Sequence, residues 1–360
     1  MRRDVKITTN RNRAGGPIFE WLELGLCHSS RLSLGIGKPL PTTLSTLNAA
    51  AGLPRGSRAR LVWCNLSVVQ GVSRNVPVSG AELFYSRRGS GIACLVLSAI
   101  GTKPYERMMP PQLGDFIELV FVDLRGGGRS SGNPTELTFD LLADDLESIR
   151  ADLGVGQVVV LGHSILGALA IEYGRRRPST VLGVIAVGTP PRGDMTWLAG
   201  QATAFFERDA SDDRKQTLRA NLSVLAADAP IDRVVLAQTP IRFFEAHQDV
   251  TSLFAEADVK PSLLGHVMGE LTRGWDITTD RRSLDVPLLL LHGRYDYTVP
   301  YTLWTGVLEK LPNASLRLFE RSGHHPFFEE PEAFTATVAD WIKSSPRGRR
   351  ANKTEKTIFP

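Results

Sequence analysis

Apolar and polar positions follow two patterns along this chain, and each pattern predicts a kind of strand. Alternation of apolar and polar residues indicates a strand with one covered face, whereas a short unbroken apolar run is typical of a strand covered on both faces. Strands of the first kind are expected over residues 72–78 and 81–87, joined by a turn at Ser79-Gly80. Buried runs and a last strand follow over residues 92–98, 117–123, 158–161, 181–187, 286–291 and 315–319.

Segments with helical spacing separate most of these strands. They cover residues 105–113, 137–153, 165–177, 301–311 and 331–342. The second of them carries four acidic residues that we expect on its outer side, namely Asp140, Asp144, Asp145 and Glu147. Regular alternation of strand and helix predicts an α/β fold, with a mostly parallel eight-stranded sheet and helices on both faces.

The alternation stops between residues 190 and 284, where only helical patterns are visible. An insertion of this length between strands is expected to form a lid or a small second domain. Its aromatic residues either line an apolar pocket or pack the insertion on the sheet, and packing is the commoner role. The pocket candidates are Trp197, Phe205, Phe243 and Phe244.

The charge pattern separates the ends of the chain from its centre. Residues 1–70 contain ten Lys/Arg and three Asp/Glu, and residues 343–360 contain six Lys/Arg and one Asp/Glu. The net charge of the whole chain is +4, so the residues between these two ends carry a net charge of −8. We expect residues 1–70 to be a poorly ordered basic extension, translated from upstream of a natural start near Val69 or Val72, and residues 344–360 to be a disordered tail. Basic residues scattered over such ends are typically solvated, so no nucleic-acid partner is expected.

Composition points to a protein of the reducing cytoplasm. The three cysteines, Cys27, Cys64 and Cys94, are too widely spaced for a disulfide framework or a zinc site. No apolar run reaches the length of a membrane-spanning helix, and Arg2-Arg3 is not followed by the apolar stretch of a secretory signal. The Arg- and Ser-rich start is weakly similar to an organelle transit peptide.

Residues 157–177 are the stretch around which the chain is organised. An apolar strand pattern ends in Gly162-His163-Ser164, and a helical pattern follows directly. A serine at such a corner is lifted out of the sheet beside helix N-terminal amides, which suits a nucleophile and a developing oxyanion. The plain structural alternative is an ordinary turn in which Ser164 caps the helix.

Two further polar residues follow later strands. Asp296 lies in the loop after the strand at 286–291, and His324 lies in the loop after the last strand. The carboxyl ends of parallel strands share one edge of a sheet, so Ser164, Asp296 and His324 are expected to meet there. Imidazole can take a proton from a hydroxyl near neutral pH, and a carboxylate orients the imidazole, so the order Ser, Asp, His predicts a catalytic triad.

From about residue 72 to residue 343, the chain resembles the α/β-hydrolase fold superfamily. The motifs are Gly-His-Ser-Ile-Leu-Gly at 162–167, Asp-Leu-Arg-Gly-Gly-Gly-Arg-Ser at 123–130, His-Gly-Arg-Tyr-Asp-Tyr-Thr-Val-Pro at 292–300 and Ser-Gly-His-His-Pro-Phe-Phe-Glu-Glu-Pro-Glu-Ala-Phe at 322–334. The resemblance implies that His324 rather than His325 is the catalytic base, and that His163 is not a catalytic base. It also implies that residues 191–284 form a helical cap on a core of residues 71–190 and 285–343. The glycine-rich loop at 123–132 lacks the ending of a P-loop and is interpreted as an internally bonded turn.

The chain departs from the family pattern at two places. Leu166 stands where a small residue is usual, with Gly167 one position later, so the corner is expected to be slightly reshaped. Ser98-Ala99-Ile100-Gly101 replaces the usual His-Gly near the oxyanion hole. Backbone amides need no particular side chain, and the expected donors are the N–H groups of Ile165 and Ile100.

The leading interpretation is a serine hydrolase that needs no cofactor and cleaves a small, partly apolar ester, lactone or amide through an acyl-enzyme on Ser164. A serine rather than an aspartate at the corner disfavours the dehalogenase and epoxide-hydrolase branches. One alternative is a proline-iminopeptidase-like aminopeptidase, in which Glu245 or Glu256 neutralises the substrate's amino terminus. The other is a non-catalytic small-molecule receptor on the same fold.

Overall fold

The computed structural model describes residues 72–226, 229, 231–279 and 283–344. The predicted basic extension at 1–70 and residues 345–360 of the predicted tail lie outside these ranges, as do Cys27 and Cys64. Cys94 is a buried free thiol.

Eight strands form one sheet, in the order β1-β2-β4-β3-β5-β6-β7-β8. The β1–β2 and β2–β4 pairs are antiparallel, and every other neighbouring pair is parallel. The predicted mostly parallel eight-stranded sheet is therefore confirmed. Its strands are β1 (Val72–Val78), β2 (Ala81–Gly89), β3 (Ile92–Ser98), β4 (Ile117–Asp123), β5 (Val158–His163), β6 (Val181–Val187), β7 (Leu288–Gly293) and β8 (Ala314–Phe319).

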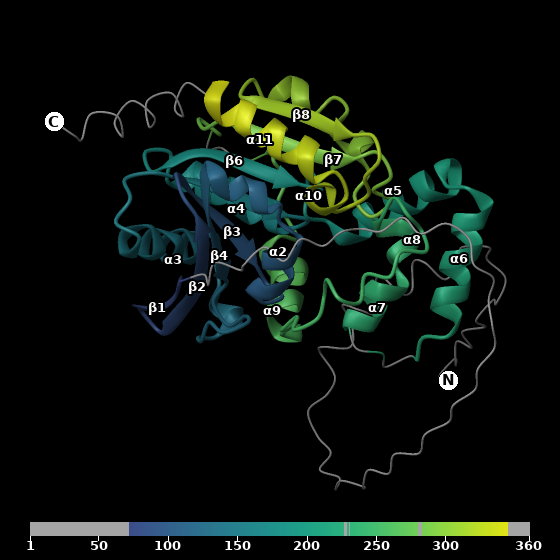
Figure 1. Ribbon diagram of the computed structural model, residues 1–360, viewed down its shortest axis with the longest axis horizontal. Helices are drawn as coiled ribbons and strands as arrows, with labels where there is room; N and C mark the ends of the chain where they lie inside the picture. The colour runs from purple at the N-terminus through teal and green to yellow at the C-terminus, as the bar shows by residue number, and fades with distance from the viewer. Residues whose placement is uncertain (1–71, 227–228, 230, 280–282, 345–360) are drawn as a thin grey trace, which may run out of the picture.

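Helices connect the strands and cover both faces of the sheet (Figure 1). They are α2 (Thr102–Met108), α3 (Phe139–Asp152), α4 (Leu166–Arg176), α10 (Pro326–Glu329) and α11 (Pro331–Ser344), with 3₁₀ turns η2 (Pro111–Asp115), η3 (Pro134–Glu136), η5 (Tyr301–Trp304) and η6 (Leu308–Lys310). Successive strand residues point to opposite faces, so Val158 and Val160 pack with α3 and α4, whereas Val159 and Leu161 pack with α2 and α11.

Two of the predicted helices are wrong in extent. The helix expected at 105–113 begins at Thr102 and ends at Met108. It ends early because Pro110 and Pro111 follow, and proline disfavours helical geometry in the residue before it. The helix expected at 301–311 is instead two short 3₁₀ turns, η5 and η6. They are separated by Gly306, which adopts a left-handed φ of 73°.

The acidic residues of α3 are not all on its outer side, as the sequence predicted. Asp140 and Asp144 are exposed, but Asp145 is buried and forms a two-point ion pair with Arg125 of the glycine-rich loop. An arginine arriving from another loop makes this burial possible, and helical spacing alone does not reveal such a partner.

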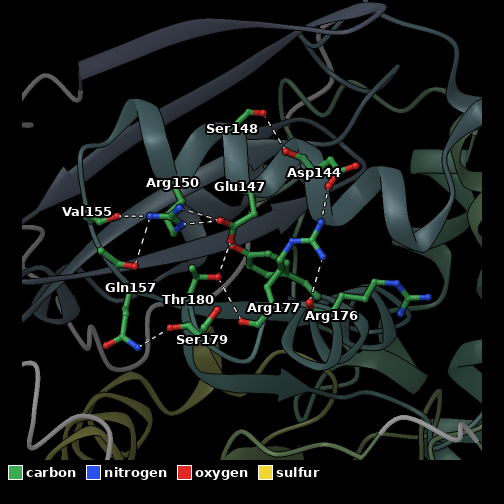
Figure 2. Close-up of polar contacts among 12 residues, drawn as sticks. Asp144, Glu147, Ser148, Arg150, Val155, Gln157, Arg176, Arg177, Ser179 and Thr180 are labelled. Atoms are coloured by element: carbon green, nitrogen blue, oxygen red, sulfur yellow. Dashed lines mark hydrogen bonds and ion pairs between the residues drawn. The ribbon is translucent and has the colours of Figure 1, made fainter.

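Glu147 of α3 is half-buried and ties three elements together (Figure 2). Its Oε1 atom accepts 2.7 Å hydrogen bonds from the hydroxyls of Tyr173 in α4 and Thr180 before β6, and Oε2 accepts one from Arg150 at 2.9 Å. Helix α4, which follows Ser164, is therefore fixed to α3 and to the start of β6.

The glycine-rich loop after β4 bonds to itself, as expected. The Gly126 N–H donates to the Ser131 carbonyl, and the Gly127 and Ser130 N–H groups donate to the carbonyls of Leu124 and Gly127. These three amides are satisfied inside the turn, which does not fit a phosphate cradle.

Between β6 and β7 the described residues form helices and no strand, apart from one isolated bridge between Arg192 and Asp276. The helices of this insertion are α5 (Met195–Asp209), α6 (Asp212–Ser223), α7 (Ile231–Ala237), α8 (Thr239–Arg242) and α9 (Pro261–His266), followed by the π-helical turn η4 (Val267–Leu271). Figure 1 shows α6, α7 and α8 grouped on the opposite side of the molecule from α3.

A separate apolar cluster joins the insertion to the core. Phe206 of α5, Leu218 and Leu222 of α6 and Ile241 of α8 pack with Tyr297, which follows β7. The insertion therefore rests on the loop that carries Asp296. Within the described part of the chain, no helix has the length and apolar character needed to cross a membrane.

Candidate active site

Ser164 lies at the corner between β5 and α4 in a left-handed backbone conformation, with φ 57°. Such geometry is costly for a residue with a side chain and is concentrated at functional sites. The Ser164 N–H donates a 2.8 Å hydrogen bond to the carbonyl of Val187, at the end of the neighbouring strand β6. The corner is thereby fixed against the sheet with Ser164 half-buried at its tip.

Two glycines make this corner possible. A Cβ on Gly162 would lie 2.2 Å from the Leu166 carbonyl oxygen, and one on Gly167 would lie 1.9 Å from Oγ1 of Thr189. Leu166, where a small residue was expected, is buried in the main apolar core. The close approach to the neighbouring chain therefore occurs at Gly167, and the corner accommodates Leu166.

Asp296 and His324 form a buried hydrogen-bonded pair. The Asp296 Oδ2 atom lies 2.7 Å from Nδ1 of His324, and both side chains are almost wholly enclosed. Oδ1 of Asp296 accepts hydrogen bonds from Thr298 N (3.0 Å), Thr298 Oγ1 (2.6 Å) and Val299 N (2.8 Å). Burial by itself raises the pKa of the Asp296 carboxyl, but the His324 ring and these donors outweigh it and hold the pKa below its ordinary value. A carboxylate is thus aimed at one nitrogen of the ring, which leaves Nε2 as the proton-accepting atom.

The pair lies beside the Ser164 corner. His163, the residue before Ser164, donates from Nε2 to the His324 carbonyl at 2.9 Å, and the two ring centroids are 4.5 Å apart. A Cβ on Gly188, just after β6, would lie 2.8 Å from Nδ1 of His324 and 3.1 Å from Oδ2 of Asp296. Among the described residues, the Ser164 hydroxyl is not hydrogen-bonded to the His324 ring, so the nucleophile stays a prediction.

Two neighbouring histidines have other contacts. The Nε2–H of His163 is committed to a carbonyl, and its Nδ1 accepts from the Tyr105 hydroxyl at 3.1 Å. His325 stacks on Phe243, with 4.5 Å between ring centroids and 9° between planes. Burial, with a smaller effect from neighbouring histidines, holds the pKa of both rings well below its ordinary value. His324 is therefore the histidine of this cluster that is paired with a carboxylate.

The two predicted oxyanion donors differ in their surroundings. Ile165 directly precedes α4, where helix N–H groups lack acceptors within the helix. The Ile100 N–H lies 3.2 Å from the Ser98 hydroxyl oxygen, and the Ile100 carbonyl accepts from Asp258 N at 2.8 Å. The Ile100 loop is thus held against the insertion, while its amide has a weak partner of its own.

The four aromatic pocket candidates occupy different environments. Phe205 is buried against Tyr297 and Tyr301, and Phe243 is buried against His325. Trp197 and Phe244 are only partly buried. The Arg192 guanidinium lies 4.6 Å from the Trp197 ring centroid, and Phe244 meets Tyr295 edge to face.

A junction between α8 and the His324 loop was not predicted from the sequence. The His324 N–H donates a 2.6 Å hydrogen bond to the Arg242 carbonyl. The partly buried Glu329 carboxylate accepts from Phe244 N (2.6 Å), Gly323 N (2.9 Å) and His325 N (3.3 Å), and desolvation raises its pKa to about 7. Glu329 lies in the 322–334 motif, but its partner Phe244 is 85 positions away in the chain.

The fold and these motifs agree with comparisons with known proteins. Residues 101–331 match the alpha/beta hydrolase fold family, and the chain belongs to that family. AB hydrolase superfamily protein YclE of Bacillus subtilis is 26% identical over 272 residues, which is 73% of this chain and 96% of the relative.

Other relatives have more specific names. A pimeloyl-acyl carrier protein methyl ester esterase of Sodalis glossinidius is 28% identical over 72% of this chain and 97% of its own length. A proline iminopeptidase of Heyndrickxia coagulans is 25% identical over 75% and 98%. Among solved structures, VinJ superimposes with a TM-score of 0.59 at 23% identity, over 76% of this chain and 99% of VinJ. Together these relatives support a hydrolase.

Proposed function

We propose that this protein is a serine hydrolase that cleaves a small, partly apolar ester, lactone or amide, with Ser164 as nucleophile, His324 as base and Asp296 as the orienting carboxylate. The observation that carries the proposal is the buried 2.7 Å contact between Asp296 and His324, next to a serine held at φ 57°. A carboxylate-bound imidazole beside a strained serine is the arrangement that acyl transfer needs.

The chemistry follows from the atoms present. Oγ of Ser164 attacks the substrate carbonyl while its proton moves to Nε2 of His324, and Asp296 stabilises the imidazolium. The proton then passes to the leaving group and an acyl-enzyme remains. Water, deprotonated by the same ring, attacks the acyl carbon, releases the acid and restores the Ser164 hydroxyl.

The developing oxyanion would be bound by backbone N–H groups, with Ile165 as the main donor and Ile100 as the second. Each donor contributes about 2.7–4 kcal/mol of transition-state stabilisation in such sites. The Ile100 N–H would exchange its 3.2 Å contact with the Ser98 hydroxyl for the stronger, charged acceptor.

The insertion would act as the cap that shapes the substrate site. Support comes from its contacts with both catalytic loops, through Tyr297 beside Asp296 and through Arg242 beside His324. Trp197 and Phe244 retain exposed surface for a substrate, whereas Phe205 and Phe243 would form the wall behind it.

Ester cleavage is favoured over aminopeptidase activity. Of the two carboxylates considered for binding an amino terminus, Glu256 forms an ion pair with Arg107, and Glu245 is exposed. Several of the relatives are named as pimeloyl-acyl carrier protein methyl ester esterases, and others as proline iminopeptidases. Side-by-side assays with p-nitrophenyl acyl esters and proline p-nitroanilide separate the two activities.

The decisive test compares the wild-type chain with Ser164→Ala on a series of p-nitrophenyl esters of increasing acyl length. Wild type should turn over at least one ester, and Ser164→Ala should lose nearly all of that activity with an unchanged circular dichroism spectrum. Saturable ligand binding without turnover by folded wild type would support the receptor alternative instead.

A further inference from the structure

Arg242, the last residue of α8, lies against the loop that carries His324. Its carbonyl accepts the His324 N–H at 2.6 Å. Gly323 approaches so closely that a Cβ there would lie 2.3 Å from the same carbonyl oxygen. The backbone of Arg242 is therefore one hydrogen bond away from the backbone of the proposed catalytic base.

The guanidinium of Arg242 shares the surroundings of the triad. Burial is the main cause of the low pKa of the His163 and His325 rings, and the Arg242 charge lowers both further. Burial also lowers the pKa of Arg242 to about 10, although the Asp296 carboxylate acts in the opposite direction. The Arg242 charge and the Asp296 carboxylate thus influence each other across the loop that the Arg242 carbonyl joins to His324.

Within the described part of the chain, this guanidinium has no carboxylate partner. Its Nε and Nη2 atoms donate at 3.2 and 2.9 Å to one neutral acceptor, Oε1 of Gln238 on the same helical turn. A guanidinium has five N–H donors, so more than half remain available. Two other buried arginines pair with carboxylates, Arg125 with Asp145 and Arg175 with Glu172, whereas the buried Arg214 donates to three backbone carbonyls.

The nearby carboxylates of Asp296 and Glu329 are already engaged elsewhere. Asp296 is bonded to His324, Thr298 and Val299, and Glu329 to three backbone N–H groups. Arg242 as a whole residue is only partly buried, as Ser164 is. A largely desolvated cation without an anionic partner is costly, and an anionic ligand would remove that cost.

We infer that Arg242 binds a carboxylate of the substrate, so that the preferred substrates are esters that also carry a free carboxylate. The inference rests on the proposed function, because it places the carboxylate beside Ser164 and His324. The planar guanidinium fork matches a carboxylate at two points, which fixes the orientation of the ester as well as its charge. A purely apolar ester would leave the cation unpaired.

The first test uses two p-nitrophenyl esters of equal acyl length, the glutarate half-ester with a free carboxylate and the neutral valerate. Wild type should prefer the half-ester in kcat/KM. In Arg242→Gln the ratio of the two kcat/KM values should fall by about 10- to 100-fold, the range expected for a hydrogen-bonded charge pair. Arg242→Lys keeps the charge without the fork and should lose less.

A matched control is Arg208→Gln, which changes an exposed arginine of the insertion that is paired with Asp209. It should leave the ratio unchanged. If Arg242→Gln and Arg242→Lys also leave the ratio unchanged, the inference is overturned. Thermal unfolding of each variant shows whether the protein remains folded.

A second test does not depend on turnover. Glutarate is titrated calorimetrically into the full chain as wild type, Ser164→Ala, Arg242→Gln and Arg242→Lys. Saturable binding that survives Ser164→Ala, weakens tenfold or more in Arg242→Gln and weakens less in Arg242→Lys supports the site even if no ester is hydrolysed. Absent binding, or equal binding in all four proteins, overturns it, whereas a failure of the proposed function alone would leave this binding intact.

Discussion

The Glu329 carboxylate accepts the Phe244 N–H at 2.6 Å, which links the inserted helices to the loop of the proposed catalytic base. The same carboxylate accepts the N–H groups of Gly323 and His325, on either side of His324. One partly buried acidic side chain therefore contacts the histidine loop and the insertion together. Movement of the insertion would be transmitted to His324 through this group and through the Arg242 carbonyl.

Glu329 should make stability depend on pH in a defined direction. Burial raises its pKa from an ordinary 4.5 to about 7, so the folded state binds a proton more tightly than the unfolded state. The stabilisation that comes from this raised pKa is complete below 4.5, the ordinary pKa of a glutamate in the unfolded chain. It is lost as pH rises through about 7, the pKa of Glu329 in the folded protein. The loss amounts to about 3 kcal/mol.

Thermal unfolding of wild type and Glu329→Gln between pH 5 and 8 measures this effect. The Tm advantage of wild type over the variant should shrink as pH rises, because glutamine does not titrate. Glu332→Gln, which changes an exposed carboxyl of α11, is the control. A constant difference between wild type and Glu329→Gln across the range would contradict the assignment.

Asp296→Asn should abolish most activity while the fold persists. The amide oxygen would keep the hydrogen bonds from Thr298 and Val299, so the amide NH2 would face His324 and donate to Nδ1. This favours the wrong tautomer of the ring, so kcat should fall by about 10³–10⁴-fold. Asp276→Asn is a matched control, since Asp276 makes the same local turn, accepting from Thr278 N at 2.9 Å and Thr278 Oγ1 at 2.7 Å, without a histidine. Equal losses in the two variants would mean that Asp296 is only a turn residue.

Gly188→Ala should displace the Asp296–His324 pair. The added Cβ would lie 2.8 Å from Nδ1 of His324, and the φ of 52° is already unfavourable for alanine. We expect a stability loss of about 1 kcal/mol and a fall in kcat/KM of tenfold or more. Gly274→Ala, where a Cβ would meet nothing within 4 Å, should change neither by a comparable amount. Wild-type kcat/KM in Gly188→Ala would show that the pair is not held against this glycine.

Much of the fold could be predicted because its signals are local. Apolar runs identify the buried strands to within one or two residues, and Gly162 and Gly167 mark the corner at Ser164. The break at Gly306 was missed because a single left-handed residue interrupts a helix without changing its apolar spacing. The burial of Asp145 was missed because its partner, Arg125, belongs to another loop.

The site was only partly predictable for the same reason. Ser164, Asp296 and His324 are recognisable because each follows a strand whose end lies on a common edge of the sheet. Arg242 and Glu329 carry no such signal. Their importance comes from hydrogen bonds between the insertion and the His324 loop, and these contacts depend on how two distant segments pack.

The proposed triad is tested most directly by the rate at which a fluorophosphonate labels the intact protein, with the adduct located by peptide mass spectrometry. We expect a single adduct on Ser164, formed rapidly in wild type, slowed by a factor of 100 or more in His324→Ala, and absent from Ser164→Ala. A folded wild-type protein whose Ser164 is not labelled, or is labelled equally fast without His324, would contradict this triad.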